Sequence, residues 1–116
     1  MRIIGNRGNT ARKVQAIASG ALASGDTVIV NSDGTVSVVG GGNLTSENYI
    51  GIASNGYATG QAATINAKGF IDDNQSSLTA GQSYYVQTNG DLGLTASDPS
   101  VFAGTAVSAT KLIVKG

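Results

Sequence analysis

The chain has 116 residues, with seven Lys or Arg and seven Asp or Glu, so its formal net charge is zero. It contains neither Cys nor His, which excludes a disulfide framework, thiolate metal ligands and the commonest general base of enzymes. A domain-wide basic surface is absent, and no apolar run approaches the roughly 20 residues of a membrane span, so we expect neither nucleic acid nor membrane as a partner.

Residues 1–12 show neither helical nor strand periodicity, and their Gly and Asn residues favour irregular backbone, so they predict an extended N-terminal arm. The arm has two apolar residues near its tip, Ile3 and Ile4. Four cations and no acid occur in the first 13 residues: Arg2, Arg7, Arg12 and Lys13. This pattern favours a tether that lies across the acidic surface of a partner, and the alternative is a mobile tail with incidental charges.

Residues 13–116 predict a single all-β domain, because short apolar runs alternate with turn signals. The first strand begins around Val14 and Ile17, and the following strands are expected at 27–30, 35–39, 48–53, 61–68, 83–94 (a hairpin), 101–108 and 110–115. The loop at 40–43 is long enough to cross to another sheet, and a bulge at Gly69 would let the strand at 61–68 continue into 70–71.

Alternation along two of these strands predicts which side chains face inward. In the strand at 61–68, the inward set is Ala63, Ile65 and Ala67, and the outward set is Thr64, Asn66 and Lys68. In the last strand, Leu112 and Val114 point one way, and Lys111, Ile113 and Lys115 point the other.

The segment 22–36 reappears 56 residues later at 78–92. Each copy has a small-Gly-polar turn, an apolar strand, an Asp-Gly or Asn-Gly turn and a second strand, and these dipeptides favour a type I′ hairpin. A further echo follows each copy, at 49–53 and 102–106. The duplication predicts a small β-barrel or sandwich built from two pseudo-repeats, at about 18–68 and 74–115.

Candidate chemical sites are few. Asp72-Asp73-Asn74 resembles part of a Ca²⁺ loop but lacks the Gly and the late Glu, so we interpret it as a solvated turn and expect no metal or other cofactor. The Ser and Thr residues have no evident base partner, so we expect no enzymatic activity.

Four tyrosines, Tyr49, Tyr57, Tyr84 and Tyr85, could form a stacking platform for sugars or bases. The favoured interpretation is that Tyr84 and Tyr85 occupy opposite faces of one strand, with one in the core and the other at an edge or subunit contact. Because the expected core is thin and rich in Ala, we also expect a homo-oligomer, whose interface would recruit Ile113 or one of this Tyr pair.

The segment 18–30 resembles the opening of small head-decoration (cement) proteins of tailed bacteriophages, in which a small-residue stretch leads into Ala-Ser-Gly-Asp (23–26) and a Val-rich strand. The Gly-Ile-Ala at 51–53 and the Thr-Gly-Gln at 59–61 continue the similarity. The segment 72–115 is similar to modules of phage virion structural proteins. The resemblance spans residues 18–115 and is more specific for virion proteins than for head versus tail.

This resemblance implies a β-barrel or sandwich that sits on the capsid exterior of the virion, often as a trimer, after synthesis in the host cytoplasm. Its partners would be the major capsid protein and further copies of itself. A single module with a short arm fits a decoration protein that stabilises the capsid, and the alternative is a tail or fibre-tip module that binds a host-surface receptor or glycan. The expected contact residues are Arg2, Ile3, Ile4, Arg7, Arg12, Lys13, Tyr84, Tyr85 and Ile113.

Overall fold

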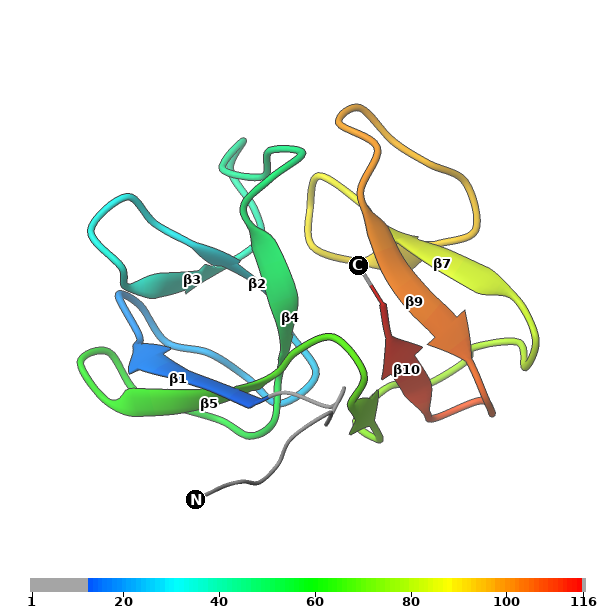
Figure 1. Ribbon diagram of the computed structural model, residues 1–116, viewed down its shortest axis with the longest axis horizontal. Coiled ribbons are helices and arrows are strands. Elements are labelled where there is room, and N and C mark those ends of the chain that lie inside the picture. Colours follow the sequence, from blue (N-terminus) through cyan, green and yellow to red (C-terminus); the bar gives the residue numbers. More distant parts are fainter. Residues whose placement is uncertain (1–12, 116) are drawn as a thin grey trace, which may run out of the picture.

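The computed structural model describes residues 13–115, and these form ten strands in two five-stranded antiparallel sheets (Figure 1). The prediction of an all-β, sandwich-like fold is therefore confirmed. The predicted arm at 1–12 and the last residue lie outside the described part of the chain.

The first sheet has the strand order β1-β5-β4-β2-β3, and the second has the order β6-β10-β9-β7-β8. The strands of the first sheet are β1 (Lys13–Ile17), β2 (Thr27–Val30), β3 (Val36–Val38), β4 (Tyr49–Ala53) and β5 (Ala62–Asn66). Those of the second sheet are β6 (Ile71–Asp72), β7 (Ser83–Val86), β8 (Leu92–Gly93), β9 (Phe102–Ala106) and β10 (Leu112–Val114).

The second sheet repeats the first strand for strand, because each strand occupies the place of the one numbered five lower. The irregularities are repeated as well. The pairing of β2 with β4 shifts register between Val28 and Ile29, and the pairing of β7 with β9 shifts between Tyr84 and Tyr85. These two positions are the ones that the 56-residue sequence echo aligns, so the predicted duplication is confirmed.

The turns of the two hairpins also match, but they are not of type I′. Gly34 and Gly90 have φ of 87° and 93°, whereas the preceding Asp33 and Asn89 do not have positive φ. In each hairpin the Gly amide donates to the carbonyl three residues earlier, which gives a three-residue loop with the left-handed Gly at its end. The type I′ prediction was wrong, because the polar side chain before each Gly accepts a hydrogen bond from the backbone N–H of the residue after the Gly.

The chain crosses between the sheets at a different place from the one predicted. The glycine-rich loop at 40–43 joins β3 to β4 within the first sheet. The crossing occurs at 67–70, where the Phe70 amide donates to the Ala67 carbonyl in a turn and Gly69 donates to Val114 of the second sheet. Gly69 has a φ of 94° at this turn, so β5 ends at Asn66 and does not continue through a bulge.

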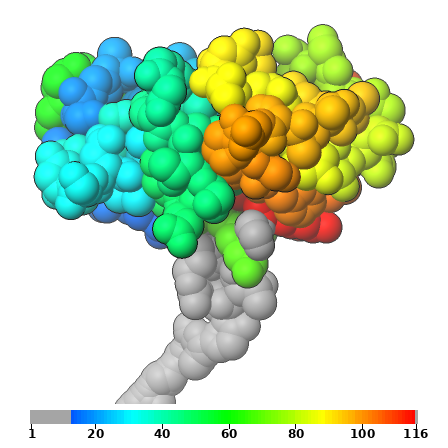
Figure 2. Space-filling view, turned by 90° about the horizontal axis from the view of Figure 1, so that it is seen from above, coloured from blue at the N-terminus to red at the C-terminus, as the bar shows by residue number. Residues whose placement is uncertain are grey.

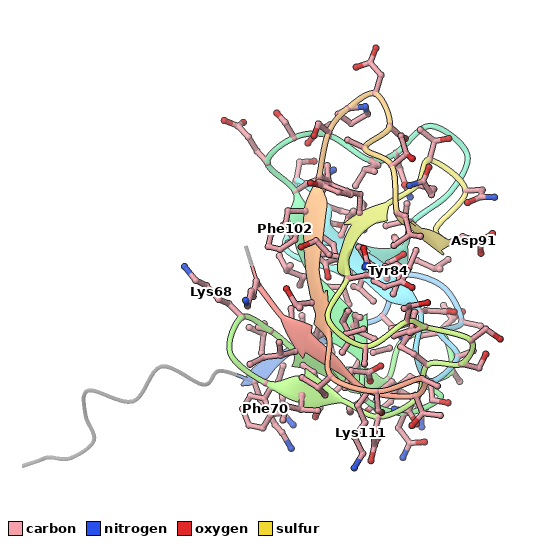
Figure 3. All side chains as sticks on the ribbon, turned by 90° about the vertical axis from the view of Figure 1, so that its right-hand side faces the viewer. Lys68, Phe70, Tyr84, Asp91, Phe102 and Lys111 are labelled. Atoms are coloured by element: carbon pink, nitrogen blue, oxygen red, sulfur yellow. The ribbon has the colours of Figure 1, made fainter. Side chains whose placement is uncertain are left out.

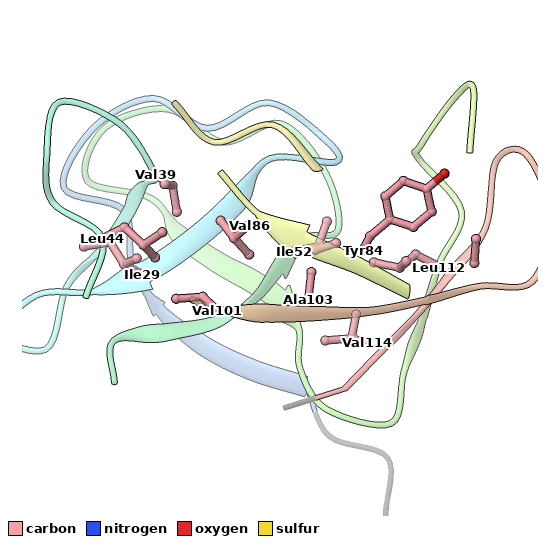
Figure 4. Packing of buried hydrophobic residues seen from close by; sticks show 11 residues of the cluster. Ile29, Val39, Leu44, Ile52, Tyr84, Val86, Val101, Ala103, Leu112 and Val114 are labelled. Carbon is pink, nitrogen blue, oxygen red and sulfur yellow. The ribbon is translucent and has the colours of Figure 1, made fainter. Parts of the chain in front are cut away.

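The buried side chains form two clusters. We call β1–β5 with their loops the first unit and β6–β10 with theirs the second unit. One cluster lies within the first unit and contains Ala18, Leu22, Val28, Val36, Ala53, Ala63 and Ile65. The other joins the units, since Ile29, Val39, Leu44 and Ile52 of the first pack against residues of the second such as Tyr84, Val86, Val101 and Ala103 (Figure 4). The space-filling view shows the two units lying directly against each other (Figure 2).

The predicted alternation in β5 holds for Ala63 and Ile65, which are buried, and for Lys68, which is exposed. Asn66 is an exception, because it is buried rather than outward-facing. Its side chain lies where the two sheets meet and donates to Asp72 of β6. A buried amide needs such a partner, so this burial depends on the second sheet and could not be read from the strand alone.

Candidate interaction surface

The strand β7 separates its two tyrosines as alternation predicts. Tyr84 is buried in the core with 5% of its surface exposed, and its phenol oxygen accepts a hydrogen bond from the Thr79 amide at 2.8 Å. Tyr85 points to the other face and is half-buried, with its ring centroid 5.7 Å from that of Phe102. The prediction of Tyr84 as a contact residue is therefore not supported, because its side chain is buried. Of the pair, only Tyr85 is available to a partner.

The other two tyrosines lie in different surroundings. Tyr57 packs against the core of the first unit, and a hydrogen bond with Ser54 lowers its pKa. Tyr49 is in β4, and its hydroxyl is buried without a hydrogen-bond partner. Burial raises the pKa of Tyr49 well above its ordinary value, and the charge of Asp72 adds to the increase. The four rings do not form the stacking platform that was considered.

The remaining predicted contact residues within the described chain are Lys13 and Ile113. Lys13 begins β1 opposite Asn66, and its ammonium nitrogen lies 5.0 Å from the centroid of the Phe70 ring, at the distance of a cation–π contact. Ile113 is half-buried in β10, between the buried Leu112 and Val114, as the alternation predicts. Arg2, Ile3, Ile4, Arg7 and Arg12 lie outside the described residues.

The carboxylate of Asp72 is the polar feature that the sequence analysis missed. It is wholly buried, so the interpretation of this segment as a solvated turn was wrong at its first residue. It accepts hydrogen bonds from the Gln75 side chain at 2.9 Å, from the Asn74 side chain at 3.1 Å and from the Asn74 amide at 3.3 Å, and the Asn66 side chain lies at 3.5 Å.

These amides also connect Asp72 to the first unit. Gln75 donates to the Gly25 carbonyl at 3.0 Å, and Asn74 donates to the Ser54 carbonyl at 3.3 Å. The Asp72 carboxylate and the side-chain amides of Asn66, Asn74 and Gln75 therefore form a hydrogen-bonded cluster between the two units, which we call the polar seam. In it, the amide groups satisfy the buried carboxylate. Among residues 13–115, no group of three or more acidic side chains is placed to hold a metal ion.

Clefts on the surface of the described chain include the following three. The cleft between the units has a volume of about 340 Å³, and the carboxylates of Asp26 and Asp91 line it. Both carboxylates already accept hydrogen bonds within their own loops, from the Ala23 amide and the Asn89 side chain. A more open cleft of about 500 Å³ follows the β7–β8 hairpin and includes Asp91 and Leu94.

The third cleft, of about 160 Å³, is lined by Ser46, Tyr49, Ser100, Val101 and Phe102. Tyr49 and Phe102 occupy equivalent places in the two units, since Tyr49 pairs with Ile29 and Phe102 pairs with Tyr85. Two aromatic rings and two hydroxyls can bind the edge of a small polar ligand or a side chain of a partner.

Within residues 13–115 there is no helix long and apolar enough to span a membrane. No family model matches the chain, and a search of curated proteins finds no match either.

Proposed function

We propose that the chain is a virion structural protein that binds the outer surface of a phage capsid and stabilises it as a decoration protein. The observation that carries the proposal is the position of exposed apolar side chains on edge strands. Val14 and Ile17 of β1 are 38% and 47% exposed, and Ile71 of β6 is 51% exposed. Natural proteins usually protect such edges, so exposed apolar residues there indicate contact with another chain.

The sequence resemblance over residues 18–115 supports the major capsid protein as that other chain, with the virion exterior as the location. The charge distribution agrees with docking of the arm. The three Arg residues all lie in 1–12, whereas the seven acidic residues all lie in residues 13–116, which we call the β body. An arm with this charge is complementary to an acidic partner surface.

Deleting residues 1–12 is expected to leave the β body folded, because β1 begins at Lys13. Binding to undecorated capsids should weaken by at least roughly tenfold, since several exposed ionic contacts of ~0.2–1 kcal/mol and burial of Ile3 and Ile4 would be lost. Cosedimentation with capsids measures the binding, and far-UV circular dichroism checks the fold. A full-length variant with the three arm Arg residues changed to Gln separates charge from apolar burial. Undiminished binding of the truncated chain would show that the arm is only a tail.

We expect the protein to act as a homo-oligomer, because the core is made largely of Ala and Val and both sheets retain open edges. The resemblance to decoration proteins implies that this oligomer is a trimer. Sedimentation equilibrium of the full chain should show a trimer, or a capsid reconstruction should show three copies around each site. Monomers in solution at high concentration, together with isolated single copies on the capsid, would contradict this expectation.

A tail or fibre-tip module that binds a host-surface glycan or protein is the second candidate function. The cleft between Tyr49 and Phe102 favours it, because aromatic rings beside hydroxyl groups suit a sugar ring. Binding of the labelled protein to host cells but not to capsids would select this function.

A further inference from the structure

The outward face of the β6–β10 edge carries an apolar pair. Ile71 and Ile113 are cross-strand partners in this antiparallel pairing. Their neighbours along the strands, Asp72, Leu112 and Val114, are buried, so the two Ile side chains point away from the core. Ile71 is half exposed, and its partner Ile113 is half-buried.

All four lysines of the described chain lie around this pair. Lys111 and Lys115 are exposed on the same side of the last strand as Ile113. Lys13 lies over the Phe70 ring, directly before Ile71, and Lys68 is in the turn that hydrogen-bonds to the end of β10. We call Ile71, Ile113 and these four lysines the lysine-rimmed face.

Asp91, which lines two of the clefts, lies away from this face. In Figure 3, Lys68 lies at the left edge of the molecule, Phe70 at the lower left and Lys111 at the bottom, whereas Asp91 lies at the right edge. One acidic residue, Asp73, directly follows β6 and borders the face at its Lys111 end.

We propose that the lysine-rimmed face is the surface by which the protein docks on an acidic protein surface, which under the proposed function belongs to the capsid shell. An apolar centre surrounded by charged side chains is the usual anatomy of a protein–protein interface. The lysines attract an acidic partner and accelerate its encounter, and the Ile pair provides the part of the contact that loses water. The apolar centre indicates that the partner is a protein rather than a nucleic acid, because proteins bind nucleic acids mainly through cationic side chains and stacked aromatic rings.

The test uses the full chain and undecorated capsids of the phage that encodes it. Ile71→Asp puts a carboxylate at the centre of the face and is expected to weaken binding by roughly tenfold or more. Leu94→Asp is the matched control, since Leu94 is 55% exposed but lies in the cleft with Asp91. Lys111→Glu combined with Lys115→Glu should slow association and reduce its salt dependence. Melting temperatures of all variants check the fold, and Ile71→Ser replaces Ile71→Asp if the latter unfolds.

The outcomes separate the two proposals. If the wild-type chain does not bind capsids, the proposed function fails. If the wild-type chain binds and Ile71→Asp binds equally well, the function stands and the assignment of this face is overturned. A larger loss for Leu94→Asp than for Ile71→Asp also overturns it. The same holds if the lysine variants lose affinity for duplex DNA or anionic lipid vesicles but keep their affinity for capsids.

Discussion

Replacing Gly104 by Ala is expected to lower the free energy of unfolding by roughly 3–5 kcal/mol, enough to unfold a marginally stable domain. A Cβ atom at this position would lie 2.1 Å from the Ile113 carbonyl oxygen and 3.2 Å from the Leu112 side chain. The obstacle is backbone of the adjacent strand β10, which cannot move without breaking its pairing with β9.

The equivalent glycine of the first unit should behave in the same way. A Cβ at Gly51 would lie 2.2 Å from the Asn66 carbonyl oxygen, and Gly51 has a φ of 153°, which side chains rarely adopt. Gly20→Ala is the matched control, because no heavy atom lies within 4 Å of its Cβ position and its φ is not positive. Urea unfolding of the three variants measures the effect. Equal stability of Gly104→Ala and Gly20→Ala would contradict the close approach of β9 to β10.

Replacing Asp72 by Ala is expected to cost about 3–5 kcal/mol of stability. The substitution removes the acceptor of the buried seam and leaves the side-chain amides of Asn66, Asn74 and Gln75 without their shared partner. Because the Gln75 side chain also donates a hydrogen bond to the Gly25 carbonyl, loss of the Asp72 carboxylate should weaken the contact between the two units.

Two further variants make the Asp72 result specific. Asp72→Asn keeps the shape and one acceptor oxygen, so its cost should be smaller, about 1–3 kcal/mol. Asp73→Ala changes the exposed neighbour and should alter stability by less than about 0.5 kcal/mol. Thermal unfolding with amide hydrogen exchange measures both stability and local opening. Equal effects at Asp72 and Asp73 would show that the seam does not hold the units together.

The sequence predicts the duplicated fold well, because each unit carries its own local signals. The Gly that ends each hairpin loop and the apolar run before it are short-range features, and they recur at a constant spacing. The alternation of β10 likewise predicts that Ile113 faces outward, which is one half of the lysine-rimmed face.

The features that the sequence does not predict depend on residues far apart in the chain. The burial of Asp72 requires side chains from β5 and from the segment after β6. One of these, Gln75, also donates to the backbone carbonyl of Gly25 in the turn before β2. The gathering of Lys13 and Lys68 beside Ile71 requires the crossing at 67–70, where a turn takes the place of the expected bulge. No periodicity within a strand contains this information, because it arises from the packing of one unit on the other.

The location of the protein on the virion tests the proposed function most directly. Virions labelled with a gold-conjugated antibody against the β body should carry label over the whole surface of the head, as a decoration protein requires. Label confined to the tail or fibre tips, or absent from purified particles, would contradict the proposal.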